Sequence, residues 1–192
     1  REVAPLALMS APAITGFTGG RPKVQPVVRL FSCLVPKAQV AASIDMGDQT
    51  VAAPPWHGQA FDPATLPQVD GPLPDADAYA RGTRIVPLVK LAWGRSGDKG
   101  DAANIGILAR KPAYLPFIRA ALSEQAVAAW FAHLVKGSVQ RFDLPGTHAL
   151  NFLMHEALGG GGIASVRMDS QGKAFAQMLL DFPVPIPADM AL

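Results

Sequence analysis

The second half of the chain predicts an α+β fold, and two observations support this. Between residues 85 and 182, segments with the apolar pattern of strands and segments with helical spacing follow one another with short connections. Their predicted order, β-β-α-α-β-α-β-α, combines paired strands with helices in the way of a compact α+β layer structure. Hydrophobic residues form 49% of the 192-residue chain, enough for a buried core.

The first predicted elements surround a glycine-rich stretch. Residues 85–93 are expected to form a strand that leads into it, and residues 104–110 the returning strand. Helical spacing predicts a short helix at 112–122 and a second helix whose N-terminus Ser123 can cap.

The remaining elements follow from the same patterns. Residues 138–144 are predicted to be a strand, and Thr147 to cap a third helix that the glycines 159–162 end. Residues 163–168 should form another strand. A last helix, with Phe175 and Phe182 on its apolar face, should stop at the prolines that follow.

The first 80 residues differ in composition from the rest of the chain, because they contain eleven of the eighteen prolines. Residues 26–36 are β-branched and aromatic and predict a strand buried on both faces, and residues 40–44 suggest a second one. Residues 54–82 are expected to be a proline-rich linker. We therefore divide the chain into a tail of a larger domain (1–53), the linker (54–82) and a module (83–192). The absence of an initiating Met suggests a piece of a longer polypeptide.

Composition excludes several classes of function. The formal net charge of +2 is too small to predict nucleic-acid binding. The single Cys33 excludes an internal disulfide framework and a Cys-based zinc site, and is typical of the reducing cytoplasm. No apolar run approaches the roughly 20 residues needed to cross a bilayer. Because charged residues form only 17% of the chain, we expect apolar surface to be covered by another subunit or by a further domain.

The stretch between residues 95 and 104 holds the densest combination of charge and glycine. A hairpin needs only a short turn, so this connection is interpreted as a functional loop. The candidate ligand-binding residues are Arg95, Ser96, Gly97, Asp98, Lys99, Gly100, Asp101 and Asn104.

Three interpretations of this loop stay open. Backbone N–H groups with Arg95 and Lys99 can cradle an anion such as phosphate or carboxylate. Asp98, Asp101 and Asn104 offer the oxygen ligands that Mg²⁺ or Ca²⁺ prefers. The third interpretation is structural, a salt-bridged loop that holds its own shape or locks two subunits together. The match of Ser96 and Lys99 to S-x-x-K is attributed to chance, because the accompanying hydrolase motifs are absent.

Other candidates are weaker. Asn151 and His155 lie at i and i+4 of the predicted third helix and so share a face, either as a boundary pair or as part of a site. His155 is a candidate general base, and Asp98 and Lys99 are the other catalytic candidates. The glycines 159–162 either stop a helix or admit a ligand.

A second, weaker anion loop is formed by Thr15, Gly19, Gly20 and Arg21. His57, His133 and His148 show no metal-ligand spacing, so we expect no metal. The dinucleotide and Walker A fingerprints are absent.

The same residues carry a family resemblance. The run Arg95-Ser96-Gly97-Asp98-Lys99-Gly100-Asp101, followed by Asn-Ile-Gly-Ile from Asn104, resembles the signature of the acyclic terpene utilisation AtuA family. Residues 141–145, 149–152, 157–161 and 169–174 are similar to that family's later blocks, and residues 15–22 and 27–33 to the end of its large N-terminal domain.

The resemblance implies a fold and a ligand class. Residues from about 83 onward would form the family's ferredoxin-like C-terminal module, a mixed sheet with helices on one face, preceded by the tail of a larger α/β domain. The family serves citronellol and geraniol catabolism, whose intermediates are branched acyl-CoA thioesters. The expected ligand is thus an acyl-CoA or another anion, with CoA entering only as part of the substrate.

The resemblance leaves the reaction open. For an enzyme of this pathway the expected chemistry is hydration or carbon–carbon cleavage, as in a hydratase or lyase. We expect a cytoplasmic homo-oligomer that contacts the large domain and binds neither nucleic acid nor membrane. The alternative is a non-catalytic module for oligomerisation or anion sensing.

Overall fold

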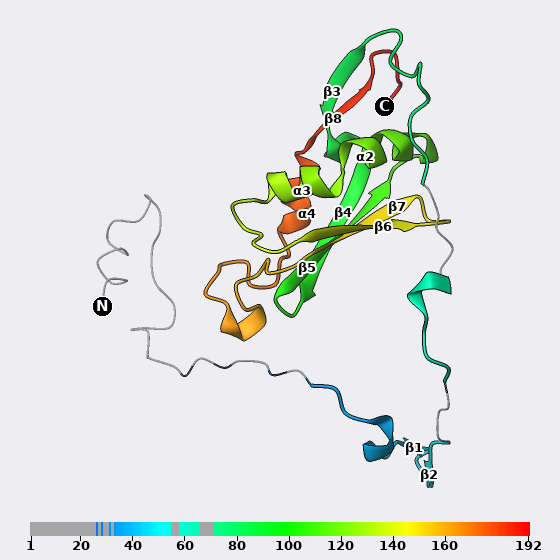
Figure 1. Ribbon diagram of the computed structural model, residues 1–192, viewed down its shortest axis with the longest axis vertical. Coiled ribbons are helices and arrows are strands. Elements are labelled where there is room, and N and C mark those ends of the chain that lie inside the picture. The colour runs from blue at the N-terminus through cyan, green and yellow to red at the C-terminus, as the bar shows by residue number, and fades with distance from the viewer. Residues whose placement is uncertain (1–25, 27, 29–30, 32, 55–57, 66–70) are drawn as a thin grey trace, which may run out of the picture.

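A computed structural model describes residues 26, 28, 31, 33–54, 58–65 and 71–192 (Figure 1). The major strands and helices are β3 (Thr83–Pro87), β4 (Ala92–Lys99), β5 (Ala102–Ala109), α2 (Leu115–Ala121), α3 (Glu124–Trp130), β6 (Val139–Leu144), β7 (Ala149–Met154), α4 (Phe175–Leu180) and β8 (Pro183–Pro187). Short 3₁₀ turns accompany them at η3 (Leu88–Lys90), η4 (Pro112–Tyr114) and η5 (Gly162–Ala164).

A four-stranded sheet with the order β4-β5-β7-β6 forms the centre of the fold, and α2, α3 and α4 lie on one of its faces (Figure 1). All three pairings in this sheet are antiparallel, where the resemblance implied a mixed sheet. The α+β class itself is confirmed. No helix of the described residues covers the other face, which we call the open face.

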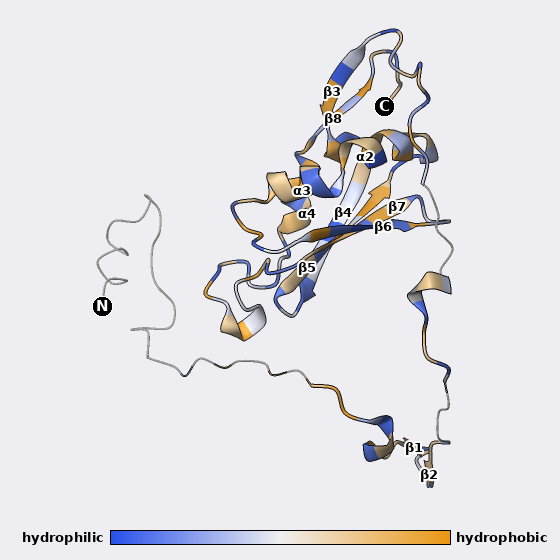
Figure 2. Cartoon of the chain, in the orientation of Figure 1, coloured by the Kyte–Doolittle hydropathy of each residue, from blue (hydrophilic) through white to orange (hydrophobic). Residues whose placement is uncertain are grey.

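Alternating burial fixes the orientation of this sheet. In β5 the side chains of Ala103, Ile105 and Ile107 are buried, whereas those between them are not. The same alternation places Phe152 and Met154 of β7 on the helix side. Figure 2 shows apolar residues along β7 and polar ones at the end of β4. The sheet therefore contributes one face to the core and leaves the other free.

The helices complete the core as their sequence predicts. Ser123 caps α3, because its Oγ accepts a hydrogen bond from the Ala126 N–H at 3.1 Å. The Phe131 ring stacks on Phe175, with ring centroids 5.4 Å apart. Behind α2, Arg119 and Asp143 form an ion pair at 2.8 Å whose side chains are mostly buried. A cap, a ring stack and an ion pair thus add specific contacts to the apolar burial of the helices.

The prolines after α4 form a strand, where the sequence predicted only a stop. In β8, Pro183, Pro185 and Pro187 alternate with Val184 and Ile186, which are fully buried. The strand pairs with β3 alone in a two-stranded ribbon. A proline lacks the N–H that a central strand must donate, but an edge strand tolerates it. This ribbon packs against α2.

Four other expectations are wrong. The third helix is the strand β7, and residues 163–168 begin with η5 and form no strand. The strand at 85–93 is interrupted by η3. The described residues of 26–36 form no strand and are exposed, Leu34 among them.

Before the module, the described residues form only short elements: η1 (Lys37–Gln39), β1 (Ser43–Asp45), β2 (Thr50–Ala52) and η2 (Pro63–Thr65). β1 overlaps the suggested strand at 40–44, and all its residues are exposed. The division at residues 53 and 82 stays a prediction. No helix in the described part of the chain has the length and apolar character needed to span a membrane.

The glycine run 159–162 packs against the tip of the β4–β5 hairpin. The Asp101 carbonyl accepts hydrogen bonds from the N–H groups of Ala157 and Leu158, both at 3.0 Å. The Asp101 carboxylate accepts another from the Gly160 N–H at 2.6 Å. A Cβ on Gly161 would overlap the carbonyl group of Gly100. The run therefore serves close backbone packing, which goes beyond the predicted helix stop.

We expect Gly161→Ala to destabilise the fold by about 2–6 kcal/mol, because it adds a backbone clash to a φ/ψ combination that only glycine adopts. Gly162→Ala is the matched control. Its φ is also positive but its Cβ would meet open space, so the loss should be about 1–2 kcal/mol. Urea unfolding of both variants measures the difference. Equal losses would contradict the packing role of Gly161.

Candidate functional site

The motif around residues 95–104 lies on two paired strands. Lys99 of β4 pairs with Ala102 of β5, so Gly100 and Asp101 alone form the turn. Gly100 takes a positive φ of 68° there, which glycine adopts without strain. The expected loop conformation is wrong, because the strand pairing continues through the charged residues to the end of the hairpin.

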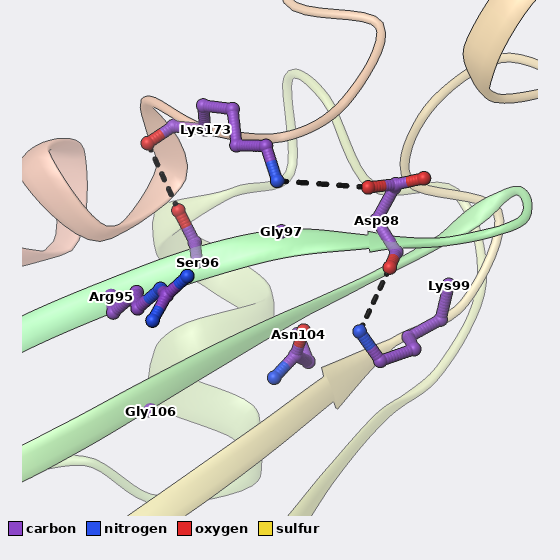
Figure 3. A pocket seen from close by; sticks show the side chains of 8 residues that line it. All are labelled: Arg95, Ser96, Gly97, Asp98, Lys99, Asn104, Gly106 and Lys173. Atoms are coloured by element: carbon purple, nitrogen blue, oxygen red, sulfur yellow. Dashed lines mark hydrogen bonds and ion pairs between the residues drawn. The ribbon is translucent and has the colours of Figure 1, made fainter.

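Strand alternation divides the motif between two faces. Ser96 and Asp98 lie on the side of the helices, in register with the buried Ile105 and Ala103. Figure 3 shows both directed towards the segment that carries Lys173. Arg95, Gly97 and Lys99 have the opposite parity and belong to the open face.

Ser96 has a structural role. Its side chain is buried, at 8% relative exposure, and its Oγ accepts a hydrogen bond from the Ala176 N–H at 2.9 Å. The same hydroxyl donates to the Lys173 carbonyl at 3.2 Å. Just before α4, the Asp169 carboxylate accepts hydrogen bonds from the N–H groups of Lys173 and Ala174. These contacts fasten the start of α4 to β4.

Lys173 reaches from this segment to Gly97. Its Nζ lies 3.2 Å from the position that a Cβ on Gly97 would occupy, and 3.8 Å from the Asp98 carboxylate. Both side chains of this ion pair are substantially exposed, so it adds little to stability. The missing side chain of Gly97 thus gives a lysine ammonium room beside the strand.

A hollow of about 300 Å³ surrounds Gly97, and we call it the Gly97 hollow. Its lining residues are Arg95, Ser96, Gly97, Asp98, Lys99, Asn104, Gly106 and Lys173 (Figure 3). Three of them are cations and one is a carboxylate. The Lys99 ammonium donates to the Asp98 carbonyl at 2.9 Å. The Arg95 guanidinium is exposed and forms no hydrogen bond or ion pair within the described part of the chain.

Asn104 and Asn151 come together on neighbouring strands of the open face. The Asn104 amide donates to the Asn151 Oδ1 at 3.1 Å. Both residues were candidates, but the predicted helical face shared by Asn151 and His155 is wrong, because Asn151 lies in β7. His155 follows the end of β7, and its Nε2 lies 3.1 Å from the Gln140 Oε1. It does not line the Gly97 hollow.

The three oxygen-bearing candidates for a cation do not converge. Asp101 is engaged with the glycine run, and Asp98 and Asn104 have opposite parity across the hairpin. No group of three His, Cys, Asp or Glu residues gathers as a metal site within the described residues. The second loop, with Thr15, Gly19, Gly20 and Arg21, lies outside the described residues, as does His57.

One tyrosine outside the hollow has a raised pKa. Burial raises the pKa of Tyr79, whose hydroxyl donates to the Pro185 carbonyl at 3.3 Å and whose ring contacts Phe117. Tyr79 does not line the hollow. The hollow is positively charged because its lining has three cations and one carboxylate.

Sequence reasoning missed Lys173 and Gly106 as parts of the site. The only signal for Lys173 was its place in the 169–174 block that resembles the AtuA family. Gly106 stood in the Asn-Ile-Gly-Ile part of the motif. Their proximity to Arg95 depends on strand pairing and on the packing of α4, which no local pattern shows.

Comparison with known families identifies the module. The sequence model of the AtuA ferredoxin-like domain matches residues 86–185, which is more than half of the chain. The chain belongs to this family. The match includes the whole β4–β5 hairpin and the segment around Lys173, so the hollow lies within the AtuA ferredoxin-like domain. No curated protein matches the chain, and no solved structure does.

The free energy of unfolding should show which residues of the AtuA motif stabilise the fold and which do not. We expect Ser96→Ala to lower the free energy of unfolding by about 1–3 kcal/mol, because the buried Ala176 N–H loses its acceptor. Arg95→Ala, one residue away, should change it by at most about 0.5 kcal/mol. Urea unfolding of both variants tests this. A comparable loss in Arg95→Ala would show that Arg95 serves the fold.

Proposed function

We propose that this AtuA module binds the anionic part of a small molecule in the Gly97 hollow. The proposed setting is the cytoplasmic breakdown of citronellol and geraniol, with branched acyl-CoA intermediates as the ligands. The observation that carries the proposal is the guanidinium of Arg95, which is exposed and unpaired within the described residues. It lines the hollow at Gly97 together with Lys99 and Lys173.

The geometry around Gly97 favours an anion. Arg95 and Lys99 lie two residues to either side on the same face of β4, each about 7 Å away along the strand. The Lys173 Nζ lies 3.2 Å from the Cβ position of Gly97. The single carboxylate, Asp98, cannot neutralise three cations, and its distance from Lys173 is long for an ion pair. An oxyanion over Gly97 would supply the missing negative charge, and a guanidinium can bind it with two parallel hydrogen bonds.

Both anionic parts of the proposed ligands fit this description. The pyrophosphate of CoA and a free carboxylate each offer oxygens to Arg95 and Lys99. CoA would enter as part of the substrate. Because the hollow offers cations and amides, we assign it to substrate binding. In a hydratase or lyase, Asp98 and Lys99 would be the candidates nearest to the bound anion.

A second function is favoured by the apolar part of the open face. Trp93, Leu108, Phe142 and Leu144 are all between 42% and 50% exposed. An assembly module would cover them with another copy or with the large domain. Asp98 pairs with Lys173 of the same chain and is therefore not needed for an ion pair between copies. Such assembly would depend on the exposed apolar residues instead. Sedimentation of Phe142→Ser would then show a smaller species than the unmodified chain.

Arg95→Ala in the full chain should weaken binding of citronellyl-CoA by about 10- to 150-fold, the factor expected for a charged hydrogen-bonded contact of about 1.5–3 kcal/mol. Lys173→Ala should act in the same direction. Titration calorimetry with citronellyl-CoA and free CoA measures the change.

Lys136→Ala is the matched control, because Lys136 is exposed and does not line the hollow. Its affinity should equal that of the unmodified chain. Unchanged affinity in Arg95→Ala, with the unmodified chain binding, would refute the assignment of the hollow.

A further inference from the structure

We propose that the open face extends the Gly97 hollow into a site for an amphiphilic carboxylate, whose hydrocarbon chain crosses Gly106 and lies on Trp93 and Leu108. The inference rests on the anion binding proposed above and names the ligand class. The ligand is an acid, or an acyl group with its own carboxylate, in which charge and branched chain adjoin.

Strand register arranges the open face in three rows. The apolar row contains Trp93, Leu108, Ala149 and Leu144. The middle row contains Arg95, Gly106, Asn151 and Phe142. The third row contains Gly97, Asn104, Leu153 and Gln140, with the polar residues Asn104 and Gln140. Successive rows are about 7 Å apart along the strands. The face therefore changes from apolar to cationic and amide-bearing within the length of a short ligand.

Gly106 leaves a notch in the middle row. It lies between Arg95 on one neighbouring strand and Asn151 on the other, each about 4.8 Å away. A Cβ on Gly106 would meet only the Arg95 backbone oxygen, at 3.8 Å. The space above Gly106 is therefore open. It joins the Gly97 hollow, which Gly106 also lines, to the apolar row.

The charge of the open face is complementary to an anion. None of the twelve positions in the three rows is Asp or Glu, and Arg95 is unpaired within the described residues. The Arg110 guanidinium lies over the Trp93 ring, 4.7 Å from its centroid. Asn151, directly opposite Gly106 in register, accepts from Asn104 through Oδ1, so its amide N–H groups stay available to a ligand. Carboxylate oxygens suit both donors.

The short distance between Arg95 and the apolar row limits which ligands can contact both. In an acyl-CoA the pantetheine arm separates the phosphates from the acyl chain, so both cannot lie within one row spacing. A carboxylate on the hydrocarbon chain itself meets this requirement. A second copy of the chain would present the same cationic face to Arg95, and the open face has no acid to receive it.

A chain-length series tests the inference on the full chain. Calorimetry with acetate, butanoate, hexanoate, octanoate and 3,7-dimethyloct-6-enoate should show binding that strengthens about three- to fourfold per buried methylene. Gly106→Val fills the notch with a residue that strands favour, so this increase should disappear. Ala120→Val places the same valine side chain on the exposed side of α2 and should keep the increase.

The outcomes distinguish this inference from the proposed function. Arg95→Ala should weaken every acid by the same factor and leave the dependence on chain length intact. A flat series in the unmodified chain, with acetate bound, would overturn the amphiphile site and leave the anion hollow standing. Absence of any anion binding would overturn both. A dimer in sedimentation that Gly106→Val disperses would also overturn the inference, because the face would then be an interface between copies.

Discussion

The alternation of side chains along β4 is the constraint on which the site depends. In an extended strand, neighbouring residues face opposite sides of the sheet. Ser96 and Asp98 therefore face the start of α4, while Arg95 and Lys99 face away from the helices. A shift of one residue in the β4–β5 register would place the cations in the core and the serine on the open face.

The register is held by contacts at both ends of the motif. At one end, the Ser96 hydroxyl joins β4 to α4 through two hydrogen bonds. At the other, Asp101 holds the glycine run against the turn. Neither contact uses the side chain of Arg95 or Lys99. The contacts that hold the hairpin are thus independent of these two cations, as the proposed binding site requires of its support.

The predictions that succeeded concerned segments whose local signals agree. The cap at Ser123 and the apolar face of α4, with Phe175 and Leu179, needed no information from elsewhere in the chain. The helix predicted at β7 failed because Leu150 and Met154 fit helical spacing, while Leu150, Phe152 and Met154 also alternate as in a strand. A six-residue apolar run cannot decide between the two periods. Pairing with β5 on one side and β6 on the other decided it.

Six of the eight residues that line the hollow were candidates from the sequence, whereas Gly106, Lys173 and the strand form of the stretch were not predicted. Arg95, Lys99, Asn104 and Asn151 all belong to the open face, yet a charged, glycine-rich stretch resembles a loop when its strand partners are unknown. Gly97 and Gly106 weaken the propensity of β4 and β5, which is why the hairpin was interpreted as a loop. The same two glycines create the hollow and the notch. The feature that misled the secondary-structure prediction is therefore the one that makes space for a ligand.

The motif can finally be divided by what the fold requires. Ser96, Gly100 and Asp101 have structural partners or conformations that explain them. Arg95 has none within the described residues, and an exposed guanidinium there adds nothing measurable to stability. Lys99 and Lys173 line the same hollow, where Asp98 is the one carboxylate beside three cations. The fold gives Lys99 and Lys173 contacts with Asp98 but gives Arg95 none within the described residues, and the proposed anionic ligand would supply the partner that Arg95 lacks.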